Sequence, residues 1–127
     1  MEDLIYKEEC YKIIGCAMEV HKALGGGFLE NVYKEALKYE FIKSGVIFDE
    51  ERMLEIRYKD IILDKKYFAD FVCYEKIILE IKAVDRLCDE HYCQVLNYLN
   101  AARFKLGLLI NFGGHKLEYK RVITNQE

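Results

Sequence analysis

The most constraining feature of this chain is the stretch 67–84, where two runs of aromatic and β-branched residues flank one short polar pair. Runs of this composition are typical of β-strands. We therefore predict a β-hairpin with strands over 67–74 and 77–84 and a tight turn at 75–76. The hairpin is long and mostly apolar, so the rest of the chain must cover it.

Three charged side chains interrupt this apolar hairpin: Asp70, Glu80 and Lys82. Side chains alternate between the faces of a strand, so Glu80 and Lys82 share one face, and a two-residue turn sets Asp70 opposite Ile81. Charged groups are rarely buried unless they are paired or bind a metal. A divalent-metal site is one explanation, and a salt bridge from Lys82 on a half-exposed sheet is the other. The residues alone leave both open.

Mg²⁺ or Mn²⁺ would suit such a site, because these cations prefer oxygen ligands. Asp70 and Glu80 would supply carboxylates, and the backbone carbonyl of Ile81 would add a third oxygen. Lys82 would then lie beside a water on the metal. There it would orient or deprotonate that water and stabilise charge building on a phosphate.

Two helices are predicted before the hairpin, over 4–24 and 28–44, each followed by glycine. Glu30, in the second helix, lies in the arc between Leu37 and Phe41. A carboxylate on the packed side of a helix costs free energy unless a partner meets it. Glu30 is therefore a candidate third carboxylate, holding a second metal or a water on the first, although an acidic residue in a first turn also suits the helix dipole. The predicted apolar face of this helix comprises Leu29, Val32, Tyr33, Ala36, Leu37 and Phe41.

A third helix is predicted over 90–103, with Asp89 as its cap. His91, Gln94 and Tyr98 form a polar strip on it, spaced by three and four residues. Gln94 would hold Lys82 or a substrate phosphate, or would be an ordinary exposed amide.

The remaining strands complete a sheet. We predict one over 46–58 and another starting at 61–63, interrupted by a bulge or loop at 64–66 before the hairpin. The apolar run within 105–112 is typical of a strand buried on both faces. A last strand over 117–123 is expected at an edge. The fold class is therefore α/β, with a mixed sheet flanked by helices.

Composition limits the remaining possibilities. The 127 residues suit a single domain over 1–127, and no apolar run approaches the length of a membrane span. The five cysteines form no Cys-x-x-Cys pair, so we expect free thiols in a reducing cytoplasm. A net charge of −3 argues weakly against a dedicated nucleic-acid binder, although metal ligands would contribute to the acidic excess.

Several motifs together resemble a known family. The stretch 27–33 matches the Gly-x-x-Glu-x-x-Tyr motif of the GxxExxY family, and the segments 70–84, 94–99 and 106–112 are also similar to it, in the same order. This family is placed in the PD-(D/E)XK nuclease superfamily, whose restriction-endonuclease-like core has the order αβββαβ. One departure is Ala69, which stands where the superfamily signature has proline.

The resemblance implies a role for each matching residue. Asp70 and Glu80 match the metal-binding carboxylates, and Lys82 matches the signature lysine. Glu30 matches an acid on a helix, and Gln94 matches a glutamine on the following helix. The expected function is a Mg²⁺- or Mn²⁺-dependent nuclease that hydrolyses phosphodiester bonds in DNA.

A different class of function stays open beside the nuclease. The domain would then be a catalytically weak or inactive module that binds nucleic acid or a protein partner. The acidic balance favours this alternative, because few basic residues are available to hold DNA. A homodimer would supply the missing surface.

Overall fold

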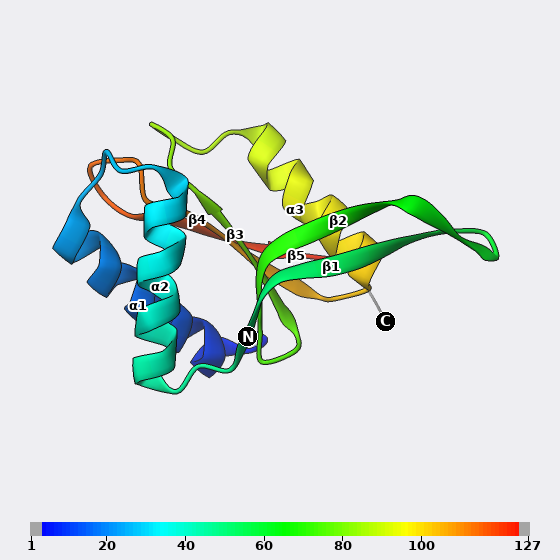
Figure 1. Ribbon diagram of the computed structural model, residues 1–127, viewed down its shortest axis with the longest axis horizontal. Helices are drawn as coiled ribbons and strands as arrows, with labels where there is room; N and C mark the ends of the chain where they lie inside the picture. The colour runs from blue at the N-terminus through cyan, green and yellow to red at the C-terminus, as the bar shows by residue number, and fades with distance from the viewer. Residues whose placement is uncertain (1–3, 125–127) are drawn as a thin grey trace.

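The computed structural model describes residues 4–124, which form a five-stranded sheet with helices on both of its faces (Figure 1). The elements are α1 (Lys7–Leu24), α2 (Glu30–Ser44), β1 (Phe48–Tyr58), β2 (Ile61–Cys73), β3 (Ile77–Lys82), α3 (Asp89–Ala102), β4 (Leu106–Asn111) and β5 (Glu118–Ile123). Their order confirms the predicted sequence of helices and strands. Helix α1 begins three residues later than predicted, and α2 two residues later.

The sheet has the strand order β1-β2-β3-β4-β5 and mixes two kinds of pairing. Antiparallel pairs join β1 to β2 and β2 to β3, and α3 then crosses over so that β4 pairs parallel with β3. All six residues of β4 are buried, as expected for a strand covered on both faces. The edge strand β5 pairs antiparallel with β4, so the predicted α/β class and mixed sheet are confirmed.

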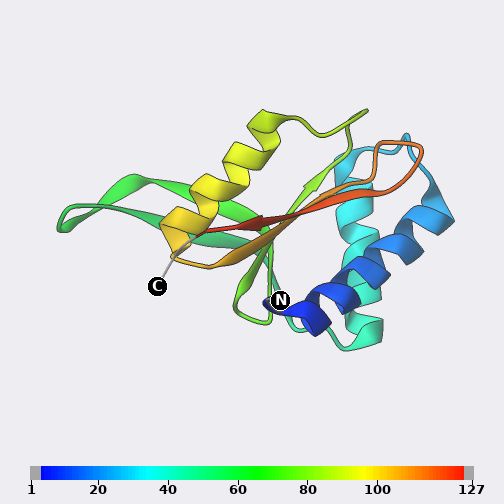
Figure 2. The same cartoon turned by 180° about the vertical axis from the view of Figure 1, so that it is seen from behind.

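Two hydrophobic cores lie on the two faces of the sheet. Helices α1 and α2 cover one face, where Tyr33, Phe41 and Phe71 are fully buried. Helix α3 covers the other face with Val95 and Leu99 (Figure 2). Side chains of β3 alternate between these cores, which confirms the predicted alternation along the hairpin.

The predicted apolar face of α2 is too wide. Leu29 and Val32 are exposed, whereas Tyr33, Leu37 and Phe41 are buried. Leu29 is the residue that precedes the helix, and the buried positions recur every four residues along one narrow stripe. A helix that meets a sheet along one stripe leaves its flanking apolar residues in solvent.

The predicted two-residue turn of the β2–β3 hairpin is wrong by one residue. Cys73 pairs with Ile77, so the turn contains three residues, and Tyr74 and Glu75 both have positive φ (56° and 59°). The N–H of Lys76 donates to the carbonyl of Cys73 at 3.1 Å, which closes the turn. If this register is continued by one residue, Asp70 lies opposite Glu80, whereas the prediction set it opposite Ile81.

Of the two alternatives predicted at 64–66, a bulge or a loop, the structure has the bulge: the four steps from Ile62 to Lys66 lie opposite the two steps from Arg57 to Glu55. Strand β2 runs continuously from Ile61 to Cys73, but its register with β1 shifts between Glu55 and Arg57. The irregularity is therefore a change of pairing within one long ribbon and not a loop. This ribbon projects beyond the rest of the sheet (Figure 1).

The cap of α3 differs from the prediction. Cys88 is the N-cap residue, and Asp89 is the first residue of the helix. The Nδ1 atom of His91 accepts the N–H of Cys88 at 3.1 Å, so His91 caps the helix.

The cysteines and helices agree with two further expectations. All five cysteines are free, and three of them are buried. Within residues 4–124, none of the helices has the length and apolar character needed to cross a bilayer.

Candidate active site

Asp70 and Glu80 lie where β2 and β3 stop pairing with each other. The last paired residues are Phe71 and Leu79. One step further, the backbone N–H of Asp70 donates to Glu80 Oε2 at 2.8 Å, and the N–H of Ile81 donates to Asp70 Oδ2 at 2.8 Å. Each carboxylate thus takes the place of a backbone carbonyl. Buried N–H groups need a partner, and here the site's own carboxylates provide it.

These two carboxylates are buried close together. Asp70 is 9% exposed and Glu80 is 3% exposed. Burial, followed by the charge of Asp70, raises the pKa of Glu80 from 4.5 to about 8. The two carboxyl groups, Asp70 and Glu80, therefore carry less than two negative charges at neutral pH. A cation bound beside them would favour the ionised form of Glu80.

Lys82 is held by the polar strip of α3 and not by the carboxylates. Its Nζ donates to Gln94 Oε1 at 2.8 Å, and Gln94 Nε2 donates to the hydroxyl of Tyr98 at 3.3 Å. The ring of Tyr98 stacks on Tyr67 with centroids 4.8 Å apart. Of the alternatives for Gln94, the lysine contact is the one observed. Among the described residues, no ion pair joins Lys82 to Asp70 or Glu80, so the simple salt-bridge explanation fails.

Glu30 is the first residue of α2 and is half-buried beside the same cluster. Burial raises its pKa, and the charge of Asp70 raises it further, whereas Lys82 and Lys34 lower it. Within residues 4–124, however, no three His, Cys, Asp or Glu side chains lie together as a ready metal site. The charge of Asp70 thus affects Glu30, but Glu30, Asp70 and Glu80 do not form one three-carboxylate group.

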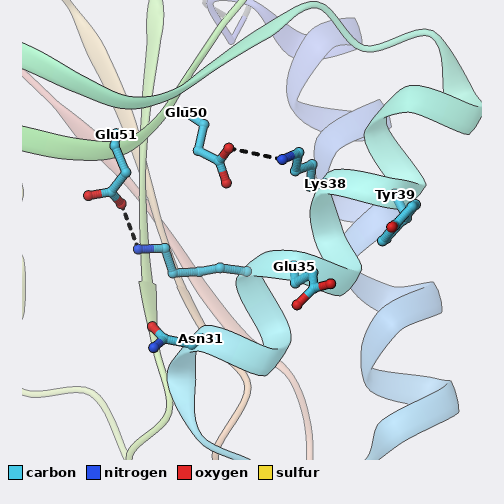
Figure 3. A pocket seen from close by; sticks show the side chains of 7 residues that line it. Asn31, Glu35, Lys38, Tyr39, Glu50 and Glu51 are labelled. Carbon is cyan, nitrogen blue, oxygen red and sulfur yellow. Dashed lines mark hydrogen bonds and ion pairs between the residues drawn. The ribbon is translucent and has the colours of Figure 1, made fainter.

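The structure adds Lys34, which the sequence reasoning missed. Its Nζ lies 2.9 Å from Asp70 Oδ1 and 2.7 Å from Glu51 Oε2. Figure 3 draws the contact with Glu51 as a dashed line. Burial alone would lower the pKa of Lys34, but its hydrogen bonds to Glu51 and Asp70 outweigh burial and raise the pKa. The sequence could have indicated Lys34 by its spacing, because Lys34 lies one helical turn after Glu30 on the same face of the helix.

A polar cavity of about 490 Å³ opens beside Lys34, between α2 and the start of β1. Figure 3 shows it with Lys38 paired to Glu50 across the opening, at 3.1 Å. Asn31, Glu35 and Tyr39 complete the lining along α2. Lys34 therefore lies between this cavity and the carboxylate cluster, because it lines the cavity and contacts Asp70.

Tyr33 supports the turn that places Glu30. Its hydroxyl donates to the carbonyl of Gly25 at 2.5 Å and accepts the N–H of Phe28 at 3.1 Å. Its ring is fully buried and stacks on Phe112 at 4.8 Å. The tyrosine of the Gly-x-x-Glu-x-x-Tyr stretch therefore fixes the loop before α2, while the glutamate of that stretch faces the cluster.

The fold and the site together define a class: an α/β domain with two carboxylates and a lysine on adjoining central strands, where the pairing of those strands stops. A family model described as the PD-(D/E)XK nuclease superfamily matches residues 7–122. The chain belongs to this superfamily, and the predicted superfamily is confirmed. Its assignment to the GxxExxY family within it stays a prediction.

Other comparisons support the fold alone. The crystal structure of SSO0001 matches with a TM-score of 0.61 at 16% sequence identity, and the match covers 96% of this chain and 59% of that chain. This chain thus spans less than two thirds of that protein. No curated protein matches this chain.

Proposed function

We propose that this domain is a divalent-metal-dependent nuclease that hydrolyses phosphodiester bonds in DNA. The observation that carries the proposal is the pair of linked, buried carboxylates Asp70 and Glu80 on adjoining strands, with Lys82 two residues beyond Glu80 and held by Gln94. Membership of the nuclease superfamily supports the reaction class. The choice of DNA, the metal dependence and the catalytic roles are part of the proposal.

The donor set is suited to Mg²⁺ or Mn²⁺. Asp70 and Glu80 offer two carboxylates, and Mg²⁺ is usually bound by one or two carboxylates with waters completing its shell. Among the described residues, no donor is bonded to Glu80 Oε1, so this oxygen is available to a cation. The carbonyl of Ile81 stays a candidate third ligand, and Glu30 a candidate outer one. When bound, the metal would supply Lewis-acid stabilisation of phosphate charge and a more acidic water.

Lys82 and Gln94 would position the substrate. The Nζ of Lys82 is already oriented by Gln94 Oε1 and carries further N–H donors for a phosphate oxygen. A fixed ammonium aimed at developing negative charge lowers the barrier without reorganising during the reaction. Glu30 would hold a water on the α2 side, where its raised pKa lets it accept or return a proton.

A second candidate function is a nuclease-fold module that binds nucleic acid or a protein without useful turnover. The ion pair between Lys34 and Asp70 favours it, because a lysine then occupies one oxygen of a proposed metal ligand. The net charge of −3 points the same way. A homodimer and a cytoplasmic location also stay predictions.

The deciding experiment compares Lys82→Ala with Lys12→Ala, an exposed lysine on α1. Labelled single-stranded DNA, duplex DNA and RNA are incubated with each protein in Mg²⁺ or Mn²⁺. We expect Lys82→Ala to lose cleavage at least a hundredfold, with an unchanged melting temperature, while Lys12→Ala cleaves as wild type. An active Lys82→Ala protein would refute the mechanism. Calorimetry shows whether Mn²⁺ binds to the wild type and is lost in Asp70→Asn, and a wild type that binds Mn²⁺ but cleaves none of the substrates would favour the binding module.

A further inference from the structure

The distal part of the β1–β2 ribbon, residues 57–66, extends away from the body of the domain and is here called the arm. Figures 1 and 2 show it projecting past α3, with no helix covering its outer half. Its strands pair at Arg57 with Ile62 and at Tyr58 with Ile61, and Lys59 turns with a φ of 53°. The arm is therefore a two-stranded ribbon whose tip pairs in register, with the register shift at its base.

The arm exposes large apolar side chains. Tyr58 and Ile61 are 54% and 55% exposed and pair across the ribbon, so they share one face, whereas Ile62, 43% exposed, pairs with Arg57 on the other face. Single exposed apolar residues are ordinary, but an adjoining pair at the end of a projecting ribbon marks an interaction site.

The arm is also basic in an acidic protein. It carries Arg57, Lys59, Lys65 and Lys66 against two aspartates, a net charge of +2, whereas the whole chain carries −3. Among the described residues, none of these four basic side chains takes part in an ion pair. Their charge is thus available to a polyanion.

A cleft lies at the base of the arm. About 470 Å³ in volume, it lies between the arm and the end of α3, and its lining includes Arg57, Tyr67 and Arg103 together with the acidic Glu55. Tyr67 stacks on Tyr98, whose hydroxyl accepts a hydrogen bond from Gln94, the partner of Lys82. This chain of side-chain contacts links the lining of the cleft to Lys82.

The dimensions of the arm select among nucleic acids. Ile61 precedes Asp70 by nine residues in β2, a span of about 30 Å at about 3.3 Å per residue. This span is close to one turn of B-form DNA, about 34 Å. The major groove of B-form DNA is about 12 Å wide and admits a two-stranded ribbon, whereas that of A-form RNA is too deep and narrow.

We propose that the arm binds duplex DNA, with its basic side chains on the phosphates and the face of Tyr58 and Ile61 in the major groove. The inference rests on the proposed function and names double-stranded DNA as the substrate class. The arm binds the duplex about one helical turn of DNA away from the carboxylates. It thereby gives an acidic domain a positively charged surface for DNA.

The test measures binding without turnover. Fluorescence anisotropy follows a labelled 30-base-pair DNA duplex in EDTA over a series of salt concentrations. The arm variant is Arg57→Gln/Lys59→Gln/Lys65→Gln. The matched control, Lys12→Gln/Lys22→Gln/Lys43→Gln, removes the same charge from exposed positions on α1 and α2. We expect the arm variant to bind at least tenfold more weakly and its salt slope to fall by about 2 to 3, at about 0.9 per phosphate contact, while the control changes little.

A second variant, Tyr58→Thr/Ile61→Thr, changes this apolar face and keeps the charge and the strand propensity. We expect it to lose about threefold to tenfold in duplex affinity with an unchanged salt slope. Equal affinities for the arm variant and its control would overturn the inference, as would RNA duplex bound as tightly as DNA duplex. Arm-dependent DNA binding by a protein without nuclease activity would refute the proposed function alone, whereas cleavage with arm-independent binding would refute this inference alone.

Discussion

Glu80→Gln tests whether the carboxylate cluster is electrostatically strained when no metal is present. Glu80 has an ordinary pKa of 4.5 that the site raises to about 8. The native state therefore holds a proton more tightly than the unfolded chain, so this contribution to stability is complete below about pH 4.5 and is lost as the pH rises through about 8. At about 1.4 kcal/mol per pKa unit, the change from 4.5 to about 8 corresponds to at most ~5 kcal/mol.

The shared charge of Asp70 and relaxation of the site reduce this limit, and we expect a loss of about 2 kcal/mol. Urea unfolding in EDTA from pH 5 to pH 9 gives the free energy of unfolding for each protein. Wild type should lose about 2 kcal/mol more over this range than Glu80→Gln, whose amide is never charged. Glu55→Gln, an exposed site on β1, should follow wild type. Parallel pH profiles for wild type and Glu80→Gln would show that Glu80 is already ionised at neutral pH.

Two further substitutions test neighbouring contacts. Lys34→Met removes the cation 2.9 Å from Asp70 Oδ1, so Mn²⁺ affinity measured by calorimetry should rise about fivefold to tenfold, whereas Lys38→Met should leave it unchanged. Weaker Mn²⁺ binding by Lys34→Met would mean that Lys34 supports the site instead of competing with the metal. Tyr33→Phe deletes the hydroxyl that meets Gly25 and Phe28 and should lower the free energy of unfolding by about 1 to 3 kcal/mol. The exposed Tyr39→Phe serves as its control, and equal losses would contradict the role of the Tyr33 hydroxyl.

Much of the fold could be predicted because the spacing of apolar residues along the sequence indicates which side chains are buried. The apolar run of β4 indicated a strand covered on both faces, and alternation along β3 placed Glu80 and Lys82 together. The Lys82–Gln94 contact was also among the predicted alternatives, because helical spacing put Gln94 and Tyr98 on one strip.

The errors came from features that local patterns do not encode. The three-residue turn contains Tyr74 and Glu75 at positive φ, where glycine or asparagine is the usual signal, so the register slipped by one. Lys34 was overlooked because an exposed lysine on a helix is the ordinary expectation, and its burial depends on Asp70, thirty-six residues away. The exposure of Leu29 depends on where α2 begins, which is among the least certain features of a sequence pattern.

Where the pairing of β2 with β3 ends, carboxylate oxygens replace backbone carbonyls as hydrogen-bond acceptors, and NMR spectroscopy can detect this difference. The amide protons of Asp70 and Ile81 are bonded to carboxylate oxygens of the site itself. The NMR chemical shift of an amide proton responds to the charge of the oxygen that accepts its hydrogen bond. The signals of these two amides therefore report the ionisation of the two carboxylates and the binding of a cation to them. The polypeptide thus carries two intrinsic NMR probes inside its candidate active centre, at positions where no label or dye would fit.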